Sequence, residues 1–513
     1  MISSVLGSTT LGVNAYLVKI ETHFSKEVPK RIIIVGLPDK AASEANERVP
    51  AAIKNSGYNI PIRKITINLA PADIKKEGSG FDLPMALGVI CEMGELKPDL
   101  LADFVFAGEL ALDGKLRPVR GVLPIAMEVK RSGLKGLIIP EENAREAAMV
   151  EGIDVHPLGS LEEVVEFINN KGGLEPFRVN VNEIFNIDEK SIVDFADVKG
   201  QQEVKRALEV AAAGGHNIIM IGPPGSGKTM LAKRIPTILP PMTFDEALET
   251  TKIHSVAGIL PANTALVTIR PFRSPHHTIS DVALVGGGSI AKPGEISYAH
   301  HGVLFLDELP EFKKNVLEVM RQPMEDGRVT ISRSKMSVEY PCNFMLASAM
   351  NPCPCGNFGN PNQECNCAPQ QIHKYISKIS GPLLDRIDIH IQVQAVKYKE
   401  LSSKVTAELS KQIRQRVIKA RERQYVRFKN KKNIFSNADM QSKDIREFCE
   451  IDSASEELLK MAITKLGLSA RAYDRILKVS RTIADLAGVE KISSAHISEA
   501  IQYRTLDRNL WLA

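Results

Sequence analysis

The sequence predicts an α/β fold, and three features of the 513-residue chain support this class. A buried strand, expected over 217–220, runs into a glycine-rich segment and then into a helix. A second apolar run, 302–306, ends in two carboxylates, as a buried parallel strand does where its carboxyl end meets a ligand. Strand-like and helix-like stretches alternate along residues 1–170, which is typical of α/β and α+β domains.

The composition is that of a globular protein with more than one core. A chain of 513 residues exceeds a single hydrophobic core, so about three domains are expected. The net charge is only +4, so any affinity for nucleic acid must come from local basic clusters. The sequence has no apolar run of about 18 residues and no basic and then apolar leader. We therefore expect a cytoplasmic protein without a membrane span.

Residues 1–170 form the first predicted domain. We expect strands over 15–20, 31–36, 64–69 and 104–110, and helices over 41–56 and 82–90. The stretches 75–84 and 108–119 resemble the Lon-type protease fold (S5 domain 2-like) that is appended to several ATPases, and this resemblance implies an α+β domain. Residues 171–193 are polar and mixed, and we interpret them as a linker.

A Lon-type peptidase needs a serine that is activated by a lysine. Gly80 stands where that serine is expected, and Pro124 stands near the expected position of the lysine. A variant peptidase stays open because three polar residues lie close by, namely Ser79, Lys75 and Lys76. The favoured prediction is a non-catalytic binding or scaffold domain.

The glycine-rich segment after the strand at 217–220 carries the pattern GxxxxGK[ST]. It consists of Gly222, Pro223, Pro224, Gly225, Ser226, Gly227, Lys228 and Thr229. Such a turn between a strand and a helix bares backbone N–H groups that cradle phosphates, and the helix N-terminus adds its positive dipole end. Lys228 would reach the β- and γ-phosphates, and the Thr229 hydroxyl would ligate Mg²⁺. The sequence therefore predicts a loop that binds ATP and Mg²⁺, rather than a chance glycine-rich turn.

Two further strand ends carry polar side chains. Asp307 and Glu308 follow the run 302–306. We expect Asp307 to hold Mg²⁺ and Glu308 to orient and deprotonate the attacking water, with capping of the next helix as the alternative. Asn351 ends a strand expected over 344–350, where it would hydrogen-bond the γ-phosphate or the water. A plain turn before Pro352 is the alternative for Asn351.

Several longer stretches resemble one family, namely 270–277, 286–288, 292–296, 300–308, 351–356 and 480–486. They resemble the Mg-chelatase-like AAA+ family, often called the YifB family, which includes the competence protein ComM. The resemblance covers nearly the whole chain and implies an AAA+ ATPase core over 194–395 and a helical C-terminal lid over 396–513. For ComM-like members it also implies a hexameric ring and an ATP-driven helicase that migrates DNA branches during recombination of incoming DNA.

Arginines supply the remaining predicted parts of the ATPase site. Arg386 is the candidate arginine finger, which would reach the γ-phosphate on a neighbouring subunit and stabilise charge in the transition state. A surface pair with Asp385 or Asp388 is the alternative. Arg471 is the candidate sensor-2 arginine of the lid and Arg475 the second choice, and a solvated arginine on a helix face is the alternative.

Two basic segments are candidate DNA contacts. The stretch 325–338 predicts a hairpin, which related ATPases project into the ring pore, and Arg328, Arg333 and Lys335 would contact phosphates there. A solvated edge hairpin is the alternative. The second candidate is a basic helix over 404–432, which carries Lys411, Arg414, Arg416, Lys419, Arg421, Arg423, Arg427, Lys429, Lys431 and Lys432. In the insertion between residues 241 and 300, we expect His276 and His277 to be structural rather than ligands.

Four of the seven cysteines form a CxC-x9-CxC cluster, namely Cys353, Cys355, Cys365 and Cys367. Four thiolates can bind Zn²⁺ tetrahedrally, although CxxC is the usual ligand pair. Reduced, redox-sensitive thiols are the main alternative, because a disulfide is not expected in a reducing cytosol. The cluster follows Asn351 closely, which predicts that it braces that loop.

The sequence thus predicts an ATPase that uses ATP and Mg²⁺, assembles into a hexameric ring and moves single-stranded or branched DNA. A chelatase-type motor that remodels a protein partner is the second prediction, because the same engine drives metal insertion into a porphyrin in the chelatase relatives. A Lon-like ATP-dependent peptidase is the third.

Overall fold

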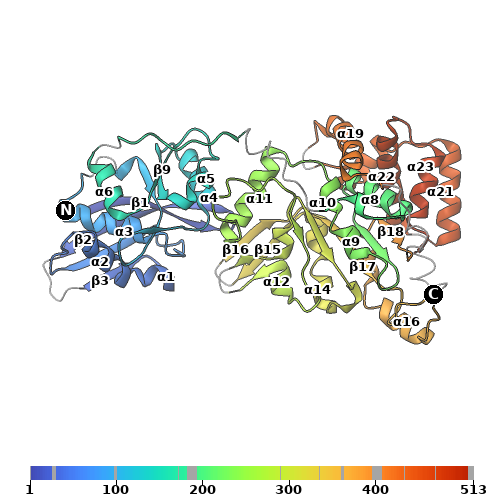
Figure 1. Cartoon of the computed structure of the whole chain (residues 1–513), viewed down its shortest axis with the longest axis horizontal. Coiled ribbons are helices and arrows are strands. Elements are labelled where there is room, and N and C mark those ends of the chain that lie inside the picture. The colour runs from blue at the N-terminus through green and yellow to red at the C-terminus, as the bar shows by residue number, and fades with distance from the viewer. Residues whose placement is uncertain are drawn as a thin grey trace. The chain divides into compact units, whose positions relative to one another are not determined.

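The computed structural model describes residues 2–25, 31–97, 101–170, 173–181, 193–288, 291–333, 336–359, 363–395, 407–431, 434–467 and 469–506. The chain, coloured from N- to C-terminus in Figure 1, forms two compact units. The first comprises Met1–Asp188, Phe244–Thr268 and Ser334–Tyr340, and the second comprises Glu189–Thr243, Ile269–Arg333 and Pro341–Ala513. Within the described ranges, every helix is too short or too polar to cross a membrane.

A mixed seven-stranded sheet, ordered β3-β4-β2-β1-β5-β8-β9, organises the first unit. Its strands are β1 (Ile2–Leu11), β2 (Asn14–Ser25), β3 (Arg31–Val35), β4 (Lys64–Ala70), β5 (Phe104–Phe106), β8 (Gly136–Pro140) and β9 (Asp154–Leu158). β1 and β2 form an antiparallel hairpin, whereas β5, β8 and β9 run parallel to one another. The predicted strands over 15–20, 31–36 and 64–69 are confirmed. The strand predicted over 104–110 is divided into β5 and the short β6 (Glu109–Leu110), which pairs with β7 (Leu116–Arg117).

The helices of the first unit are α1 (Lys40–Ser43), α2 (Ala45–Asn55), α3 (Asp82–Glu92), α4 (Val122–Arg131), α5 (Ala144–Ala147), α6 (Leu161–Asn169) and α11 (Phe244–Ala257). The single helix predicted over 41–56 is therefore two helices, α1 and α2. A mixed sheet with helices agrees with the α+β class predicted for this region, while its relation to the Lon-type fold stays a prediction.

Helix α11 belongs to the first unit although it is inserted between two segments of the second. The Gly121 N–H donates to the Ser255 carbonyl over 3.3 Å. The buried Glu146 carboxylate accepts hydrogen bonds from the Leu123 N–H at 2.8 Å and from the Ser255 hydroxyl. Burial raises the pKa of Glu146, and these hydrogen bonds oppose that rise. The insertion predicted within the ATPase core is thus partly a component of the N-terminal unit.

A parallel five-stranded sheet, ordered β11-β14-β17-β10-β18, organises the second unit. Its strands are β11 (Phe272–Arg273), β14 (Val303–Leu306), β17 (Met345–Met350), β10 (Ile218–Ile221) and β18 (Ile389–Gln392). All residues of β10, β14 and β17 are buried, which explains why each strand appears in the sequence as a continuous apolar run. The three strands that the sequence predicts for this region are confirmed.

The remaining elements around this sheet are mostly short. They are α8 (Gln202–Gly214), α9 (Lys228–Ala232), α10 (Ile235–Ile238), α12 (Asp281–Val285), β12 (Gly286–Gly287), β13 (Lys292–Pro293), α13 (Glu295–Tyr298), α14 (Lys314–Glu318), α15 (Arg321–Asp326), α16 (Pro369–Ile376) and α17 (Gly381–Leu384). The predicted hairpin at 325–338 is confirmed, since β15 (Arg328–Arg333) pairs with β16 (Met336–Pro341).

The C-terminal region of the second unit is helical, as predicted. It contains α19 (Ser410–Phe428), α20 (Ser442–Phe448), α21 (Ser453–Leu466), α22 (Ala470–Ala487) and α23 (Ser494–Gln502). Residues 396–406, expected at the start of this region, lie outside the described residues, as do 182–192 of the expected linker. The apolar faces of α19 and α22 share one hydrophobic core with α8 and β10, so the helices and the parallel sheet form a single folded unit.

Candidate active site

The predicted phosphate loop, residues 222–229, connects β10, which lies between β17 and β18 in the parallel sheet, to α9. Gly225 and Gly227 adopt left-handed backbone conformations with φ of +75° and +87°. A Cβ atom on Gly222 would lie 2.1 Å from the Val393 carbonyl oxygen, so only glycine fits at this position. The loop ends directly at the start of α9, with Lys228 as its first helical residue. This is the geometry in which backbone N–H groups and a helix N-terminus can hold an anion.

Lys228 is buried within this loop, with 8% of its surface exposed. Its ammonium donates to the carbonyls of Gly222 at 2.8 Å and Pro223 at 2.9 Å, and to the Asn351 side-chain oxygen at 3.2 Å. Burial lowers the pKa of Lys228, and the nearby carboxylates of Asp307 and Glu308 oppose that shift. The structure therefore brings together the lysine and the asparagine that the sequence predicts for phosphate binding.

The predicted magnesium ligands also lie side by side. The Thr229 hydroxyl donates to the Asp307 carboxylate over 2.6 Å. Hydroxyl and carboxylate oxygens are the ligand types that Mg²⁺ accepts, and the ion keeps water and phosphate oxygens for the rest of its shell. The donor set thus fits Mg²⁺, with Thr229 and Asp307 as the residues that would hold it.

Glu308 follows Asp307 with a left-handed backbone, at φ +53°, and with 55% of its side chain exposed. Its carboxylate lies 3.3 Å from Nδ1 of His277. The His277 ring is flanked by His276, whose ring centroid is 4.0 Å away, and by Phe312, whose centroid is 6.4 Å away. The contact with Glu308 and the two neighbouring rings therefore hold the His277 ring beside Glu308, the residue predicted to activate water.

The sequence analysis missed this position of His277. A signal for it exists, because β11 and β14 are adjacent and parallel, with Phe272 opposite Val303. Residues that follow two adjacent parallel strands emerge at the same edge of the sheet. Using that signal requires the strand order, which the sequence does not display.

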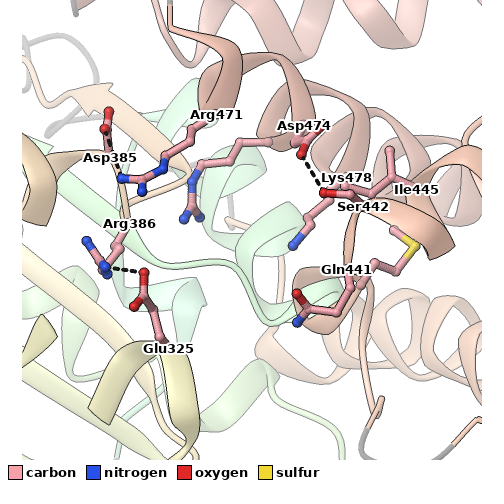
Figure 2. Close-up of a pocket in the computed structure, with 11 residues that line it drawn as sticks. Glu325, Asp385, Arg386, Gln441, Ser442, Ile445, Arg471, Asp474 and Lys478 are labelled. Carbon is pink, nitrogen blue, oxygen red and sulfur yellow. Dashed lines mark hydrogen bonds and ion pairs between the residues drawn. The ribbon is translucent and has the colours of Figure 1, made fainter. Parts of the chain in front are cut away.

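Arg386 and Arg471 lie together in a second place, a cavity of about 160 Å³ that Figure 2 shows in close-up. Arg386 is 7% exposed, donates to the Pro382 carbonyl at 2.6 Å and pairs with Glu325. Arg471 is 65% exposed, with its guanidinium 3.8 Å from the Asp385 carboxylate. Neither of the alternative partners considered for Arg386 from the sequence, Asp385 and Asp388, pairs with it in the described structure.

Within one chain, the two arginines of the cavity are separate from the residues of the phosphate loop. Among the described residues, neither arginine of the cavity forms a hydrogen bond or an ion pair with Lys228, Thr229 or Asp307. A cavity lined by arginines and open to solvent suits an anionic group that arrives from outside the chain.

Arg475, the second sensor-2 candidate, is engaged in a different role. It pairs with the buried Asp388, whose carboxylate also lies 3.0 Å from Nδ1 of His216. The other ring nitrogen of His216 is 2.8 Å from the Thr482 hydroxyl in α22. Burial alone would raise the pKa of Asp388, but Arg475 and His216 hold it below its usual range. This network connects α22 to the ends of β10 and β18, so the structure favours Arg471 over Arg475 as the arginine open to a ligand.

The predicted DNA contacts are less completely described. Arg328 is exposed at the start of β15. Arg333 lies in the same strand, its side chain is not described, and Lys335 lies outside the described residues.

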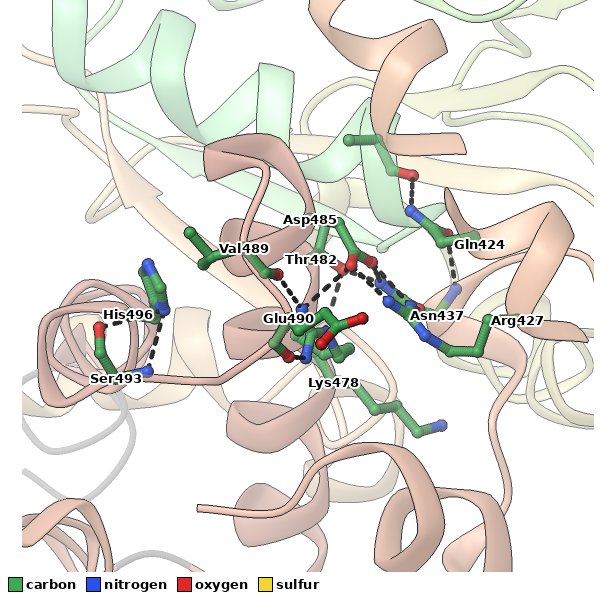
Figure 3. Close-up of polar contacts among 12 residues, drawn as sticks. Gln424, Arg427, Asn437, Lys478, Thr482, Asp485, Val489, Glu490, Ser493 and His496 are labelled. Carbon is green, nitrogen blue, oxygen red and sulfur yellow. Dashed lines mark hydrogen bonds and ion pairs between the residues drawn. The ribbon is translucent and has the colours of Figure 1, made fainter. Parts of the chain in front are cut away.

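Much of the basic helix predicted over 404–432 is occupied by contacts within the chain. Arg427 binds the Asp485 carboxylate at 2.5 and 2.8 Å, and Asn437 donates to the same carboxylate, as Figure 3 shows. Arg416 pairs with Glu209 and Glu408, and Lys431 pairs with Asp444 and Glu447. These ion pairs give Arg416, Arg427 and Lys431 a structural role, while DNA contact by either basic segment stays a prediction.

The four clustered cysteines lie together as predicted. Cys353 Sγ is 3.4 Å from Cys355 Sγ and 3.6 Å from Cys365 Sγ, and the latter two are 3.6 Å apart. The Cys367 sulfur completes the cluster, and all four sulfurs lie within 4.8 Å of one another. The cluster is compatible with a structural zinc ion.

For the peptidase alternative, the described residues Ser79, Lys75 and Lys76 form no serine–lysine pair. The Ser79 hydroxyl donates to Glu109, Lys75 pairs with Glu77, and Lys76 donates to the Pro71 carbonyl. Gly80 and Pro124 stand at the places discussed for a catalytic pair, and neither has a functional side chain. This arrangement agrees with the favoured expectation of a non-catalytic domain, which stays a prediction.

A parallel sheet with a phosphate loop, two acids after β14 and an asparagine after β17 defines the class of AAA+ nucleotide-binding proteins. Family profiles described as "Magnesium chelatase, subunit ChlI", "Subunit ChlI of Mg-chelatase" and "Magnesium chelatase, subunit ChlI C-terminal" match residues 194–401, 20–143 and 407–504. The chain belongs to the Mg-chelatase-like AAA+ family of ComM and YifB.

Individual relatives cover nearly the whole length of the chain. It is 44% identical to the competence protein ComM of Haemophilus influenzae over 99% of this chain and 98% of that protein. It is 43% identical to the uncharacterized protein YifB of Escherichia coli, over 99% of this chain and 98% of that one. A magnesium-chelatase subunit ChlI of Euglena gracilis is 22% identical over 42% of this chain and 63% of its own length. The family that the sequence motifs predict is thereby confirmed.

Proposed function

We propose that the protein hydrolyses ATP as a hexameric ring and uses that energy to move DNA, as a ComM-like helicase that promotes branch migration in recombination. The observation that carries the ATPase part is the convergence of Lys228, Thr229, Asp307 and Asn351 at one end of the parallel sheet. ATP is the substrate and Mg²⁺ the metal that this set of groups fits.

The residues of one chain have distinct roles in this proposal. The ammonium of Lys228 leaves the loop carbonyls and binds the β- and γ-phosphates. Thr229 and Asp307 hold Mg²⁺, which when bound neutralises phosphate charge. Glu308 accepts a proton from the attacking water, and Asn351 positions that water or the γ-phosphate.

The separate position of the arginines supports the proposed ring. Arg386 and Arg471 line one cavity, and among the described residues neither forms a hydrogen bond or an ion pair with the phosphate loop of its own chain. We infer that both act on the ATP of a neighbouring subunit, where a guanidinium stabilises the charge of the transferred phosphoryl group. This role makes hydrolysis depend on assembly.

The proposed action on DNA is supported by two observations. The relative from Haemophilus influenzae that matches over the whole chain is named a competence protein. The β15–β16 hairpin exposes Arg328, and Arg333 and Lys335 follow it in the sequence, which suits sequence-independent contact with phosphates. A zinc ion on the cysteine cluster completes the proposed set of cofactors.

A chelatase-type motor that acts on a protein partner is the second candidate function. The family profiles that match three segments of the chain carry the chelatase name. A Lon-like peptidase is disfavoured because the Ser79 hydroxyl is bound by Glu109.

Branch migration by the purified full-length protein on a synthetic four-way junction tests the DNA proposal. We expect ATP-dependent conversion of the junction to products, abolished by Lys228→Ala and retained by Lys233→Ala, a control lysine exposed just beyond α9. ATP hydrolysis without any DNA binding or movement would overturn the DNA part and favour the protein-partner candidate. A protein that stays monomeric with ATP and Mg²⁺ in sedimentation would overturn the ring.

A further inference from the structure

We propose that the four-cysteine cluster is a zinc centre that braces the phosphate loop, so that the bound metal sets the affinity of the site for ATP. This inference rests on the proposed function in that it takes the loop at 222–229 as the ATP site. It goes beyond that function because it connects a metal to the loop through the contact between Gly356 and Pro224.

The sulfur geometry fits a tetrahedral zinc ion. With Zn–S bonds of about 2.3 Å, the sulfurs of a tetrahedral site stand about 3.8 Å apart. The three recorded separations among Cys353, Cys355 and Cys365 are 3.4, 3.6 and 3.6 Å, and Cys367 lies within 4.8 Å of each. All four cysteines are free of disulfides.

The backbone around the cluster supplies the supporting hydrogen bonds that thiolate ligands require. The Phe358 N–H donates to Cys353 Sγ over 3.3 Å, and the Asn357 N–H donates to Cys355. Such bonds orient ligands and stabilise their negative charge. The segment between the two cysteine pairs has turn chemistry and few apolar residues in its sequence, so it offers little apolar packing of its own and a bound ion would stabilise it.

Two connections join the cluster to the phosphate loop, one through β17 and one through Gly356. Strand β17 leads into it and pairs with β10, with Met350 opposite Ile221, and the Gly222 N–H donates to the Met350 carbonyl at 3.2 Å. Asn351, which binds Lys228, stands two residues before the first cysteine ligand. The chain then turns back, and Gly356 reaches the loop itself.

Gly356 packs directly on Pro224, in the middle of the phosphate loop. A Cβ atom at Gly356 would lie 2.4 Å from Cδ and 2.7 Å from Cγ of Pro224, which leaves no room for a larger residue. The proline ring is rigid, so it cannot move aside without moving the loop. Pro224 is adjacent to Pro223, whose carbonyl binds Lys228.

A metal that fixes Cys353 and Cys355 to the second cysteine pair therefore also fixes Gly356 against Pro224. Without the metal, part of the phosphate loop has to be ordered when ATP binds. Ordering about one residue weakens binding roughly tenfold. We therefore expect metal removal to raise the Kd for ATP about tenfold.

Zinc content and nucleotide affinity, measured separately on the full-length protein, test this inference. Zinc is determined by plasma mass spectrometry after purification without added metal, and affinity is determined with a fluorescent, non-hydrolysable ATP analogue. The parent is expected to hold about one zinc per chain. Cys365→Ser is expected to lose zinc and bind the analogue about tenfold more weakly, and a chelator is expected to do the same to the parent. Cys91→Ser, a cysteine of the first unit, is the control that keeps both properties.

Two glycines distinguish the brace from a general effect on the loop. Gly356→Ala is expected to weaken analogue binding while zinc is retained, because the added methyl group displaces Pro224. Gly359→Ala is the matched control, since Gly359 has a similar φ of +74° and open space where its Cβ would stand. Circular dichroism on each variant shows whether it is folded.

Each alternative outcome has a distinct meaning. A parent with less than about half an equivalent of zinc and tight analogue binding overturns the inference and leaves the proposed ATPase intact. Loss of zinc with unchanged affinity, or equal effects of the two glycine variants, overturns the brace. A zinc-loaded parent that does not bind the analogue overturns the proposed ATPase function, and the brace with it.

Discussion

Replacing Asp388 with asparagine tests how the helical C-terminal region is held on the parallel sheet. Asp388 is 3% exposed and has two partners, His216 and Arg475, the latter with 22% of its side chain exposed. Asparagine keeps the shape of the side chain but leaves the guanidinium without its counter-ion. Breaking a buried pair in this way costs about 3–5 kcal/mol, and the partial exposure of Arg475 places the expected loss near the lower end, about 3 kcal/mol.

The pH dependence of that loss follows from the direction of the pKa shift. Arg475 and His216, acting against burial, hold the pKa of Asp388 below its ordinary value of 3.8. The stabilisation from a group with a lowered folded-state pKa is complete above the unfolded-state pKa and disappears as the pH falls through the folded-state value. The contribution of Asp388 is therefore expected to be the same at pH 8 and pH 6, and to shrink only below about pH 4.

Urea unfolding of the full-length protein, followed by circular dichroism, measures this effect. The transition of the second unit is recognised because an ATP analogue shifts it. Asp474→Asn, at a part-buried residue that lines the arginine cavity, is the control and is expected to change stability by less than about 0.5 kcal/mol. The double variant Asp388→Asn/Arg475→Met is expected to recover much of the loss, because no charge is left unpaired. A loss below about 1 kcal/mol, or no recovery in the double variant, would refute the reasoning.

The remaining predictions concern the site itself. Glu308→Gln is expected to lower ATP turnover by about 10²–10⁴-fold with unchanged nucleotide affinity, and an equal loss of affinity would contradict its role as a base. His277→Phe is expected to lower kcat about tenfold or more without changing the Kd, because the ring that orients Glu308 loses its nitrogen. His276→Phe is its control, since Nδ1 of His276 contacts Thr278, and equal effects would rule out the orienting role. Affinity for ATP is expected to fall as the pH rises from 7 towards 10, because burial lowers the pKa of Lys228 and the neutral amine binds phosphate poorly, so a flat titration would contradict this. Mixed Arg386→Ala and Lys228→Ala subunits are expected to regain part of the activity that each lacks alone, and no recovery would contradict action between subunits.

The site could be predicted from the sequence wherever its signal was local. The phosphate loop, the acids after β14 and the asparagine after β17 each combine an apolar run with polar residues at a fixed distance, and the structure brings them together. The four cysteines are likewise close in sequence. What could not be predicted depends on strand order and on long-range partners. Arg386 is bound by Glu325, which lies far earlier in the chain in α15, and His277 meets Glu308 only because β11 and β14 are neighbours.

Strand β1 shows why part of the fold was missed. Its sequence contains serines and a glycine, which are weaker strand signals than β-branched or aromatic residues. The structure requires small residues there, since a Cβ at Gly7 would lie 2.8 Å from the Ile20 side chain. The Ser3 hydroxyl is buried and donates to the Gly88 carbonyl at 2.8 Å. Close packing of β1 against β2 and α3 therefore favours small residues, and these make the strand difficult to recognise from the sequence pattern.

The helix cap at Asp452 shows the same limit on a smaller scale. The sequence Ser453–Glu456 resembles a capping box with Ser453 as the N-cap, but α21 begins one residue earlier than that pattern implies. Asp452 is the N-cap, and its carboxylate accepts the Ser455 N–H at 2.8 Å. Aspartate and serine are both good caps, so the choice between neighbours depends on the approach of the preceding chain.

The insertion of α11 into the first unit has a consequence for how the protein is made. A chain emerges from the ribosome with its N-terminus first, so the β1–β2 hairpin and the strands up to β9 are available early. The helix that covers α4, and the Ser255 hydroxyl that binds the buried Glu146, follow only after the phosphate loop has been synthesised. The segment Ser334–Tyr340 comes later still. The N-terminal unit is thus completed only after three of the five strands of the parallel sheet have been synthesised, and a nascent chain stalled before residue 244 is expected to expose an unfinished surface to chaperones.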